Sequence, residues 1–325
     1  MRPLAAALCT LLCLVPVARA HDPRSTWQTL TTPHFRLHYA DPLEAQAQRM
    51  ADAAEAAHDA LVPRLGELPE GGVDIVVSDE MDAANGFARR APYSLMDLNA
   101  AAPEDLSELS DYRDWAFTLV AHELTHVVHF NSIGGAAAWI DAVFGPVIVP
   151  NSIQPTWFVE GLAVYFESIL TGRGRVRSTY FDTLLRTAVL DDLAMDLGVI
   201  SGAPWAFPQG GVPYLYGGRF LDHIARTHGE ASVRALVHDY GSRLVPFALN
   251  LSALQSTGAD YDTHYARFLE ELRERYEAQR ERVVAAGVRQ GEPLTTRGQG
   301  VGPARARPDG SLVYVEAPID DHAAL

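Results

Sequence analysis

The chain has 325 residues, of which 48% are apolar and 21% are charged, a composition typical of globular proteins. Its 41 acidic side chains outnumber 26 basic ones, which gives a net charge of −15. Nucleic-acid-binding proteins normally carry a basic face, so this charge argues against that class. The length predicts two domains, or one large domain with an appendage.

The first 20 residues predict a secretory signal peptide. Arg2 precedes an apolar run over residues 4–17, and Ala18-Arg19-Ala20 matches an A-x-A cleavage site. An N-terminal anchor that is never cleaved is the alternative. We therefore expect an exported protein, periplasmic or extracellular, without a stable membrane span.

Removal of this segment changes the composition of the mature chain. Cys9 and Cys13 are the two cysteines of the sequence, so the mature chain has no disulfide and no thiol ligand. Loss of Arg2 and Arg19 leaves 24 basic against 41 acidic side chains, a net charge of −17.

Residues 27–110 predict a small mixed sheet with one helix. Alternating apolar and polar residues over 27–39 predict a strand, and VDIVV at 73–77 predicts a short buried strand. The Ala-rich segment 42–65 has helical spacing. Asn85-Gly86-Phe87 predicts a turn, followed by a weaker edge strand around 93–98.

Residues 111–290 predict a mostly helical part with Gly- and Pro-rich connections. We predict helices at 115–130, 156–169, 179–193, 214–227, 231–240 and 261–286. The apolar, Gly-rich stretch 136–150 predicts a buried hairpin, and contact with a membrane or a substrate is the alternative. Together these elements define an α+β fold.

The sharpest chemical signal is His122-Glu123-Leu124-Thr125-His126, an H-E-x-x-H motif in a helix. Residues four apart share a helix face, so both imidazoles can reach one metal ion. Glu123 is offset by one residue, which favours a general base that acts on a water ligand over a third metal ligand.

A third ligand is predicted on the next helix. The spacing of metzincins would require a histidine where Ser132 stands, so that class is excluded. Glu160 lies in the otherwise apolar segment WFVEGLA, where an ionised carboxylate needs a strong partner. A zinc ion bound by His122, His126 and Glu160 would keep a fourth position open for water.

These two motifs resemble those of the gluzincins of the peptidase MA clan. More narrowly, the chain resembles bacterial MA-like peptidases whose catalytic domain precedes a TolB-like β-propeller; the opening T-x-x-H-F-x-L-H-Y and the segment YLYGGRF at 214–220 agree with this. The resemblance spans roughly residues 27–280. It implies one zinc ion on His122, His126 and Glu160, Glu123 as base, and a sheet whose edge strand binds extended peptide above the active-site helix.

Four further residues have weaker assignments. Tyr216, with Tyr214 next, is our candidate for stabilising the oxyanion, because gluzincins often use a Tyr or His from a downstream helix. Packing of both tyrosines is the alternative. His129 is interpreted as a core residue or an outer partner of the site, and Glu167 as a group that orients a ligand histidine or as a surface residue.

We therefore predict three segments: a signal peptide at 1–20, a zinc metallopeptidase domain at 21–290 with a sheet part at 27–110 and a helical part at 111–290, and a β tail at 291–325. The tail is either the start of a truncated propeller or a terminal β-hairpin. The substrate is expected to be a peptide or protein; the oligomeric state is not predicted. A catalytically inactive binding module and a zinc hydrolase of a non-peptide bond are the alternative functions.

Overall fold

A computed structural model describes residues 24–104, 107–202, 204–244, 248–294 and 304–314. The predicted signal peptide, residues 1–20, lies outside the described residues. The chain divides into two compact units that do not follow chain order. Unit 1 comprises the described parts of Met1–Ala102, Asp114–Ile153 and Arg234–Pro246, and unit 2 comprises those of Pro103–Arg113, Gln154–Val233 and Phe247–Leu325.

Unit 1 opens with a β-hairpin in place of the single strand predicted over 27–39. Strand β1 (Trp27–Thr31) pairs antiparallel with β2 (Phe35–Ala40). Thr32 closes the turn, since its backbone N–H donates to the Phe35 carbonyl at 2.9 Å. The alternating pattern runs through this turn, which is why the prediction merged the two strands.

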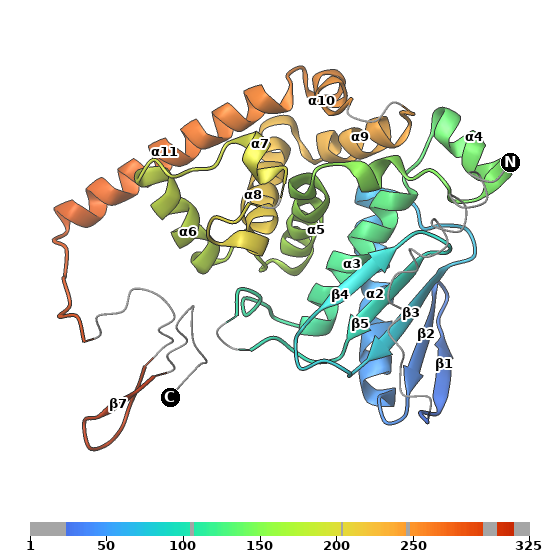
Figure 1. The fold of residues 1–325 in the computed structure, drawn as a ribbon, viewed down its shortest axis with the longest axis horizontal. Coiled ribbons are helices and arrows are strands. Elements are labelled where there is room, and N and C mark those ends of the chain that lie inside the picture. Colours follow the sequence, from blue (N-terminus) through green and yellow to red (C-terminus); the bar gives the residue numbers. More distant parts are fainter. Residues whose placement is uncertain (1–23, 105–106, 203, 245–247, 295–303, 315–325) are drawn as a thin grey trace, which may run out of the picture. The chain divides into compact units, whose positions relative to one another are not determined.

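The hairpin belongs to a five-stranded mixed sheet (Figure 1) with the order β1-β2-β3-β5-β4. Strand β3 (Val73–Ser78) runs parallel to β2, and helix α2 (Glu44–Leu65) makes the crossover between them. The buried side chains of β2 and β3 alternate with half-buried or exposed ones. One face of these strands is therefore the core face, as the period-two pattern predicts.

The far edge of the sheet differs from the prediction. Strand β5 (Leu95–Asn99) is parallel to β3 and also pairs antiparallel with β4 (Gly86–Arg89), so β4 is the edge strand. We predicted a turn at 85–87 and an edge strand at 93–98. Four of the five residues of β5 are buried, as an interior strand requires.

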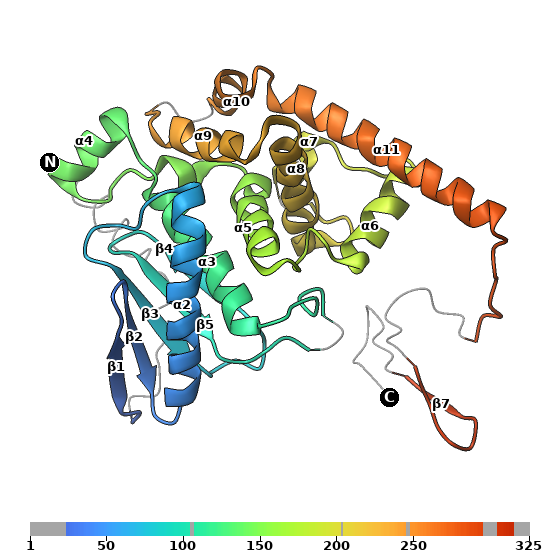
Figure 2. The same cartoon turned by 180° about the vertical axis from the view of Figure 1, so that it is seen from behind.

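Helices α2 and α3 (Trp115–Asn131) pack against one another and against the sheet (Figure 2). The buried side of α2 is mostly alanine, and its fully buried alanines are Ala47, Ala51, Ala54 and Ala57. Small side chains let the helix lie close to its neighbours. Helix α3 contacts both β4 and β5, which places it beneath the sheet edge.

The stretch predicted as a buried hairpin is helix α4 (Gly135–Phe144), followed by the 3₁₀ turn η1 (Pro150–Ile153). Trp139 is 67% exposed and Phe144 is 66% exposed, so the prediction of burial is wrong. Apolar composition alone does not distinguish a buried hairpin from a helix that displays its apolar side chains. Among the described helices, none by itself has the length and apolar composition of a membrane span. Helices α3 and α4 reach that length and composition only when taken together, as a pair bent by 93°.

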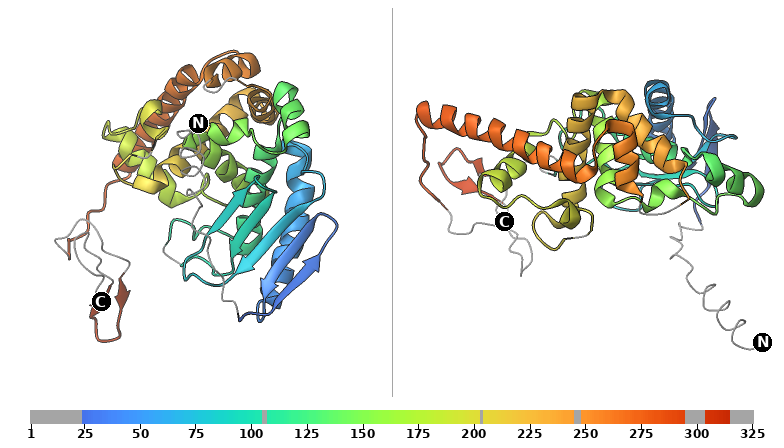
Figure 3. Two further views of the ribbon diagram at one scale, coloured as in Figure 1. Left: turned by 45° about the vertical axis from the view of Figure 1, so that its right-hand side comes forward. Right: turned by 90° about the horizontal axis from the view of Figure 1, so that it is seen from above.

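Unit 2 is built on four long helices, which Figure 3 shows from two further directions. They are α5 (Thr156–Thr171), α6 (Thr179–Leu190), α8 (Val212–His228) and α11 (Tyr261–Ala285). Shorter pieces connect them, namely α7 (Leu197–Ile200), η2 (Gln209–Gly211) and α10 (Leu249–Thr257). Helix α9 (Glu230–Gly241) contains the boundary at which the chain passes between the units.

Glycines allow α5 and α8 to approach closely. A Cβ built on Gly217 would lie 2.0 Å from the carbonyl oxygen of Trp157, and one built on Gly161 would lie 2.5 Å from the carbonyl carbon of Gly217. No larger residue fits either position without backbone movement. This contact fixes the first turns of α5, where Glu160 stands.

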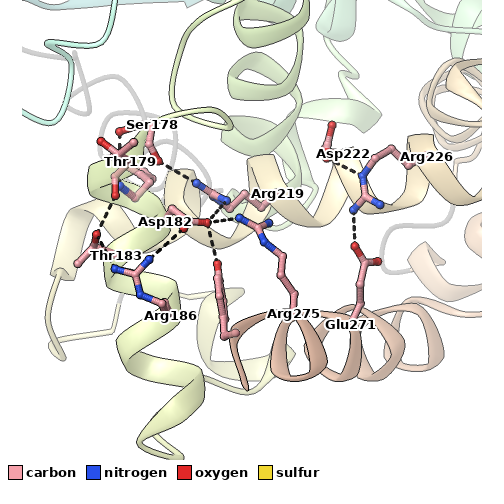
Figure 4. Close-up of polar contacts among 12 residues, drawn as sticks. Ser178, Thr179, Asp182, Thr183, Arg186, Arg219, Asp222, Arg226, Glu271 and Arg275 are labelled. Carbon is pink, nitrogen blue, oxygen red and sulfur yellow. Dashed lines mark hydrogen bonds and ion pairs between the residues drawn. The ribbon is translucent and has the colours of Figure 1, made fainter. Parts of the chain in front are cut away.

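A charged network joins α6, α8 and α11 within unit 2 (Figure 4). The carboxylate of Asp182 accepts hydrogen bonds from Arg219 at 3.0 Å, Arg275 at 2.6 Å and the Tyr276 hydroxyl at 3.0 Å. The carboxylate of Asp182 on α6 thus accepts hydrogen bonds from side chains of both α8 and α11. Its replacement would leave the buried Arg219 without this counter-charge.

The described part of the tail forms a short β-hairpin. Strand β6 (Arg305–Ala306) pairs antiparallel with β7 (Leu312–Val313), and residues 307–311 form the turn. This fits both interpretations of residues 291–325, the terminal hairpin and the start of a propeller blade.

One buried histidine of unit 2 makes stability depend on pH. His264 of α11 is 1% exposed, its Nε2 lies 2.7 Å from the Thr257 hydroxyl, and its ring meets that of His228 edge-on. Burial and then the nearby charge of His228 lower the pKa of His264 to about 4. The unfolded chain binds this proton near pH 6.5, so stability is full above that pH and falls as the pH drops towards 4.

We expect His264→Gln to remove this part of the pH dependence. Between pH 6.5 and 4 the free energy of unfolding of the native chain should fall by about 1–2 kcal/mol more than that of the variant. The reason is that glutamine keeps a hydrogen-bonding group but does not titrate. Urea unfolding at pH 8, 6 and 5 measures this difference. Equal slopes of stability against pH in both proteins would contradict the assignment.

Candidate metal centre

The H-E-x-x-H motif lies in α3, a helix of unit 1 that is buried along almost its whole length. The side chain of Asp114 caps its first turn by accepting a hydrogen bond from the backbone N–H of Phe117 at 3.3 Å. His122, Glu123 and His126 are 7%, 5% and 7% exposed. Three polar side chains thus stand in an apolar environment, where they need strong partners.

The two histidines are arranged as a metal site requires. Their ring centroids lie 5.0 Å apart with the planes at 83°, and a ring nitrogen of each lies within 4.8 Å of the other. Phe130 stacks on His126 at 5.7 Å, which restricts the orientation of that ring. A buried pair of imidazoles one helical turn apart, with a carboxylate between them in sequence, fits the donor set that binds zinc.

Glu123 lies directly against the edge strand of the sheet. A Cβ built on Gly86 of β4 would lie 2.7 Å from Oε1 of Glu123 and 2.8 Å from its Cγ. Glycine at this position therefore makes room for the carboxylate beside the strand backbone. The sequence indicated only a turn at Asn85-Gly86-Phe87, because the contact of Gly86 with Glu123 depends on how β4 packs on α3.

His129 stands one turn beyond His126 in the protein core. It is fully buried, stacks on Phe130 at 5.4 Å, and its backbone carbonyl accepts a hydrogen bond from the Asn151 side chain at 2.8 Å. This environment agrees with the interpretation of His129 as a core or outer residue.

Glu160 belongs to unit 2 and lies in the second turn of α5, half-buried. Its neighbour Gly161 is the residue at which α5 packs on the backbone of α8. Pro155 is the N-cap residue of this helix, and no side chain of that residue caps the first turn with a hydrogen bond. The position of the carboxylate along α5 is therefore set by the contact between the two helices.

Glu167 has a partner that the sequence did not indicate. Its carboxylate accepts hydrogen bonds from Arg175, with Oε1 3.0 Å from Nε and Oε2 2.6 Å from Nη2. Both side chains are buried, and burial alone would lower the pKa of Arg175, but Glu167 raises it above its ordinary value. The guanidinium lies 4.7 Å from the ring centre of Tyr214. Glu167 is thus half of a buried ion pair and not a surface residue.

The two candidate tyrosines differ in their surroundings. Tyr216 is 1% exposed, and its hydroxyl oxygen accepts a hydrogen bond from the backbone N–H of Met195 at 3.3 Å. Burial raises the pKa of Tyr216, and the bond from Met195 offsets part of that rise. Tyr214 is half-buried, beneath Arg175. Two residues apart on α8, the side chains point in different directions.

No protein-family model matches this chain. Among curated proteins, the chain is similar to an "Uncharacterized protein" of Treponema pallidum (strain Nichols), with 22% identity over 204 residues. The matched part is 62% of this chain and 18% of that protein. The chain therefore spans about a fifth of the length of the curated relative that it matches.

Among solved structures, the chain is similar to an M1 zinc metallopeptidase from Deinococcus radiodurans, with a TM-score of 0.40 and 15% identity. That match covers 76% of this chain and 51% of the metallopeptidase. Native yeast LTA4 hydrolase gives a TM-score of 0.45 and 13% identity, and covers 83% of this chain and 40% of its own. The chain spans about half of each of these proteins or less.

The contact between Gly86 and Glu123 gives a specific prediction. We expect Gly86→Ala to displace the Glu123 carboxylate and so to lower the turnover of the peptidase that we propose below about 10- to 100-fold. The protein should still fold and bind zinc, since the displaced atoms are the end of a flexible side chain. Steady-state kinetics and metal content measure the two effects.

Gly198→Ala is the matched control, because a Cβ at Gly198 meets no atom within 4 Å. Its turnover should equal that of the native chain. Native turnover in Gly86→Ala would show that Glu123 does not depend on this contact.

Proposed function

We propose that this chain is a zinc-dependent peptidase in which Glu123 acts as the general base. The observation that carries the proposal is the buried α3, which presents two histidines one turn apart and holds Glu123 against the edge strand β4. A purely structural zinc site would be closed by four ligands and would not need a carboxylate at this position.

His122 and His126 would bind the ion, and Glu160 would supply the third ligand. The chemistry of the set supports this assignment, since two imidazoles and one carboxylate leave a position open for water, as catalytic zinc sites do. The half-buried Glu160 is an acidic residue among apolar ones on α5. When bound, zinc lowers the pKa of its water ligand to about 7 and polarises the substrate carbonyl.

Glu123 performs the proton transfers. Its carboxylate accepts a proton from the attacking water and later donates that proton to the leaving amine. This role requires a carboxylate held at one position beside the scissile bond. The close contact with Gly86 supports it, because the backbone of β4 limits the space open to the side chain.

The edge strand β4 is our candidate for substrate binding. Its partner β5 lies on one side, and in the described sheet no strand pairs with its other side. An extended peptide can add to such an edge through backbone hydrogen bonds, which orients the scissile bond with little dependence on sequence. Gly86 would then place the peptide close to Glu123.

A donor from α8 is proposed to stabilise the oxyanion. The sequence makes Tyr216 our first candidate. Its burial and its hydrogen bond with Met195 argue against this role, however, and so favour the half-buried Tyr214. Tyr214→Phe and Tyr216→Phe separate the two. Loss of the donor should lower kcat about 10²- to 10³-fold at unchanged zinc content. The other variant should change stability by about 1 kcal/mol and leave kcat near native.

Two other functions remain as alternatives: a catalytically inactive binding module and a zinc hydrolase of a non-peptide bond. The metal and cleavage assays described below distinguish both from a peptidase.

We further propose that the protein is exported to the periplasm or the exterior, on the basis of residues 1–20, and that its substrate is a peptide or protein. The net charge of −15 supports the proposal that nucleic acid is not a partner.

Glu123→Gln and Glu160→Ala test the proposal in the mature protein. We expect Glu123→Gln to retain zinc and to lose casein or peptide-library cleavage by at least about 10²-fold, since the amide cannot accept the proton. Glu160→Ala should lose most of its zinc, because a carboxylate ligand is removed. Metal analysis and cleavage assays measure both.

Unchanged cleavage by Glu123→Gln would overturn the mechanism, and absence of metal from the native chain would overturn the site. Full zinc retention in Glu160→Ala would move the third ligand elsewhere. Zinc binding without cleavage of any peptide in the native protein would favour the binding module or the non-peptide hydrolase.

A further inference from the structure

A second group of potential metal ligands lies in unit 1, at the start of β2. It consists of His34, which precedes β2, and of Glu55 and His58, which stand three residues apart on α2. One ligand atom of each residue lies within 4.8 Å of the ligand atoms of the other two. None of the three residues has a part in the proposed peptidase site.

Hydrogen bonds hold the carboxylate of Glu55 in one orientation. Its Oε1 accepts from the Thr32 hydroxyl at 2.6 Å and from the backbone N–H of His34 at 3.0 Å. Its Oε2 lies 2.7 Å from Nδ1 of His34. Partial burial alone would raise the pKa of Glu55, but these bonds outweigh it and lower the pKa below its ordinary value. The group is therefore an ionised carboxylate at neutral pH.

The two imidazoles lie face to face. Their ring centroids are 3.7 Å apart with the planes at 17°, and the buried Phe35 meets both rings edge-on. The stack and the contacts with Phe35 hold both imidazoles beside the carboxylate of Glu55.

An outer carboxylate is also present. Nδ1 of His58 lies 3.1 Å from Oδ1 of Asp59, a contact that favours a proton on Nδ1 and a lone pair on Nε2. Histidines that bind metals commonly donate their other ring N–H to a carboxylate in this way. The side chain of His34 is 41% exposed and that of Glu55 is 26% exposed, so an ion can enter from solvent.

We propose that His34, Glu55 and His58 form a second metal site, for a divalent ion of the zinc class. Two imidazoles and a carboxylate suit zinc and its neighbours, and not calcium or magnesium, which prefer oxygen ligands. Ligand atoms of a tetrahedral zinc stand about 3.3 Å apart. Nδ1 of His34 and Oε2 of Glu55 lie 2.7 Å apart, so an ion would part these two atoms slightly, and the ring of His58, with a ligand atom within 4.8 Å of the other two, would turn out of the stack towards the ion. The ion would lie between His34 and Glu55, with the imidazole of His34 carrying its hydrogen on Nε2 in place of Nδ1 and water completing the coordination.

Such an ion would join the start of β2 to the middle of α2. Both elements contribute to the core face of the sheet, so the ion would strengthen the contact that Glu55 already makes with Thr32 and His34. With three protein ligands and access from solvent, it should bind more weakly than a closed four-ligand site.

Metal stoichiometry of the mature protein tests this proposal independently of peptidase activity. Zn²⁺ and Co²⁺ are titrated into chelator-treated protein, with calorimetry and the visible absorption of bound Co²⁺ as readouts. We expect two equivalents in the native chain and one in His34→Ala/His58→Ala. His122→Ala/His126→Ala should also bind one equivalent, with a different Co²⁺ spectrum, and Zn²⁺ should raise its Tm.

His38→Ala is the matched control. His38, on β2, is also partly exposed and contacts a carboxylate, with Nε2 3.0 Å from Oδ1 of Asp74, but it belongs to no group of three ligands among the described residues. It should retain both equivalents. Circular dichroism checks that each variant folds, and the conservative pair His34→Gln/His58→Gln replaces any variant that does not.

The outcomes for the two sites are separable. A single equivalent in the native chain, lost in His122→Ala/His126→Ala, would overturn the second site and leave the peptidase proposal intact. Two equivalents that persist in His34→Ala/His58→Ala would overturn the second site as well. One equivalent that is lost only with His34 and His58 would support the second site and overturn the first.

Discussion

The burial of α3 is the constraint on which the rest of unit 1 depends. A helix packed against both α2 and the sheet can tolerate two imidazoles and a carboxylate only where they bind each other, a metal or a substrate. Their desolvation is costly for folding. The same desolvation makes them effective in chemistry, because electrostatic interactions are stronger when water is excluded.

Close backbone approach at glycines positions the chemical groups in both units. In unit 1 the missing side chain of Gly86 makes room for Glu123 beside the edge strand. In unit 2, Gly161 and Gly217 bring α5 and α8 together next to Glu160. In each case a carboxylate is placed by a neighbour that has no side chain of its own.

The sequence predicted the elements whose periodicity is strong and local. It identified α3 and its motif, α5, α8 and the long α11, and the buried β3. It missed the division between β1 and β2, because alternation continues through the turn at Thr32, and it placed the sheet edge at 93–98 because the pairing of β4 is a tertiary property. The sequence likewise could not predict that Arg175 pairs with Glu167 or that Tyr216 is buried, since both depend on which segments pack together in the fold.

The division of the chain between the units has a consequence for fragments. The chain passes from one unit to the other five times, so no single cut yields either unit whole. A fragment that stops before residue 234 would lack Arg234 and His238, which bond to the carbonyl groups of Pro63 and Leu65 at the end of α2. A truncation at residue 110 would separate the sheet from α3. Expression of isolated parts would therefore expose apolar surface, whereas insertions at loop tips would preserve both units.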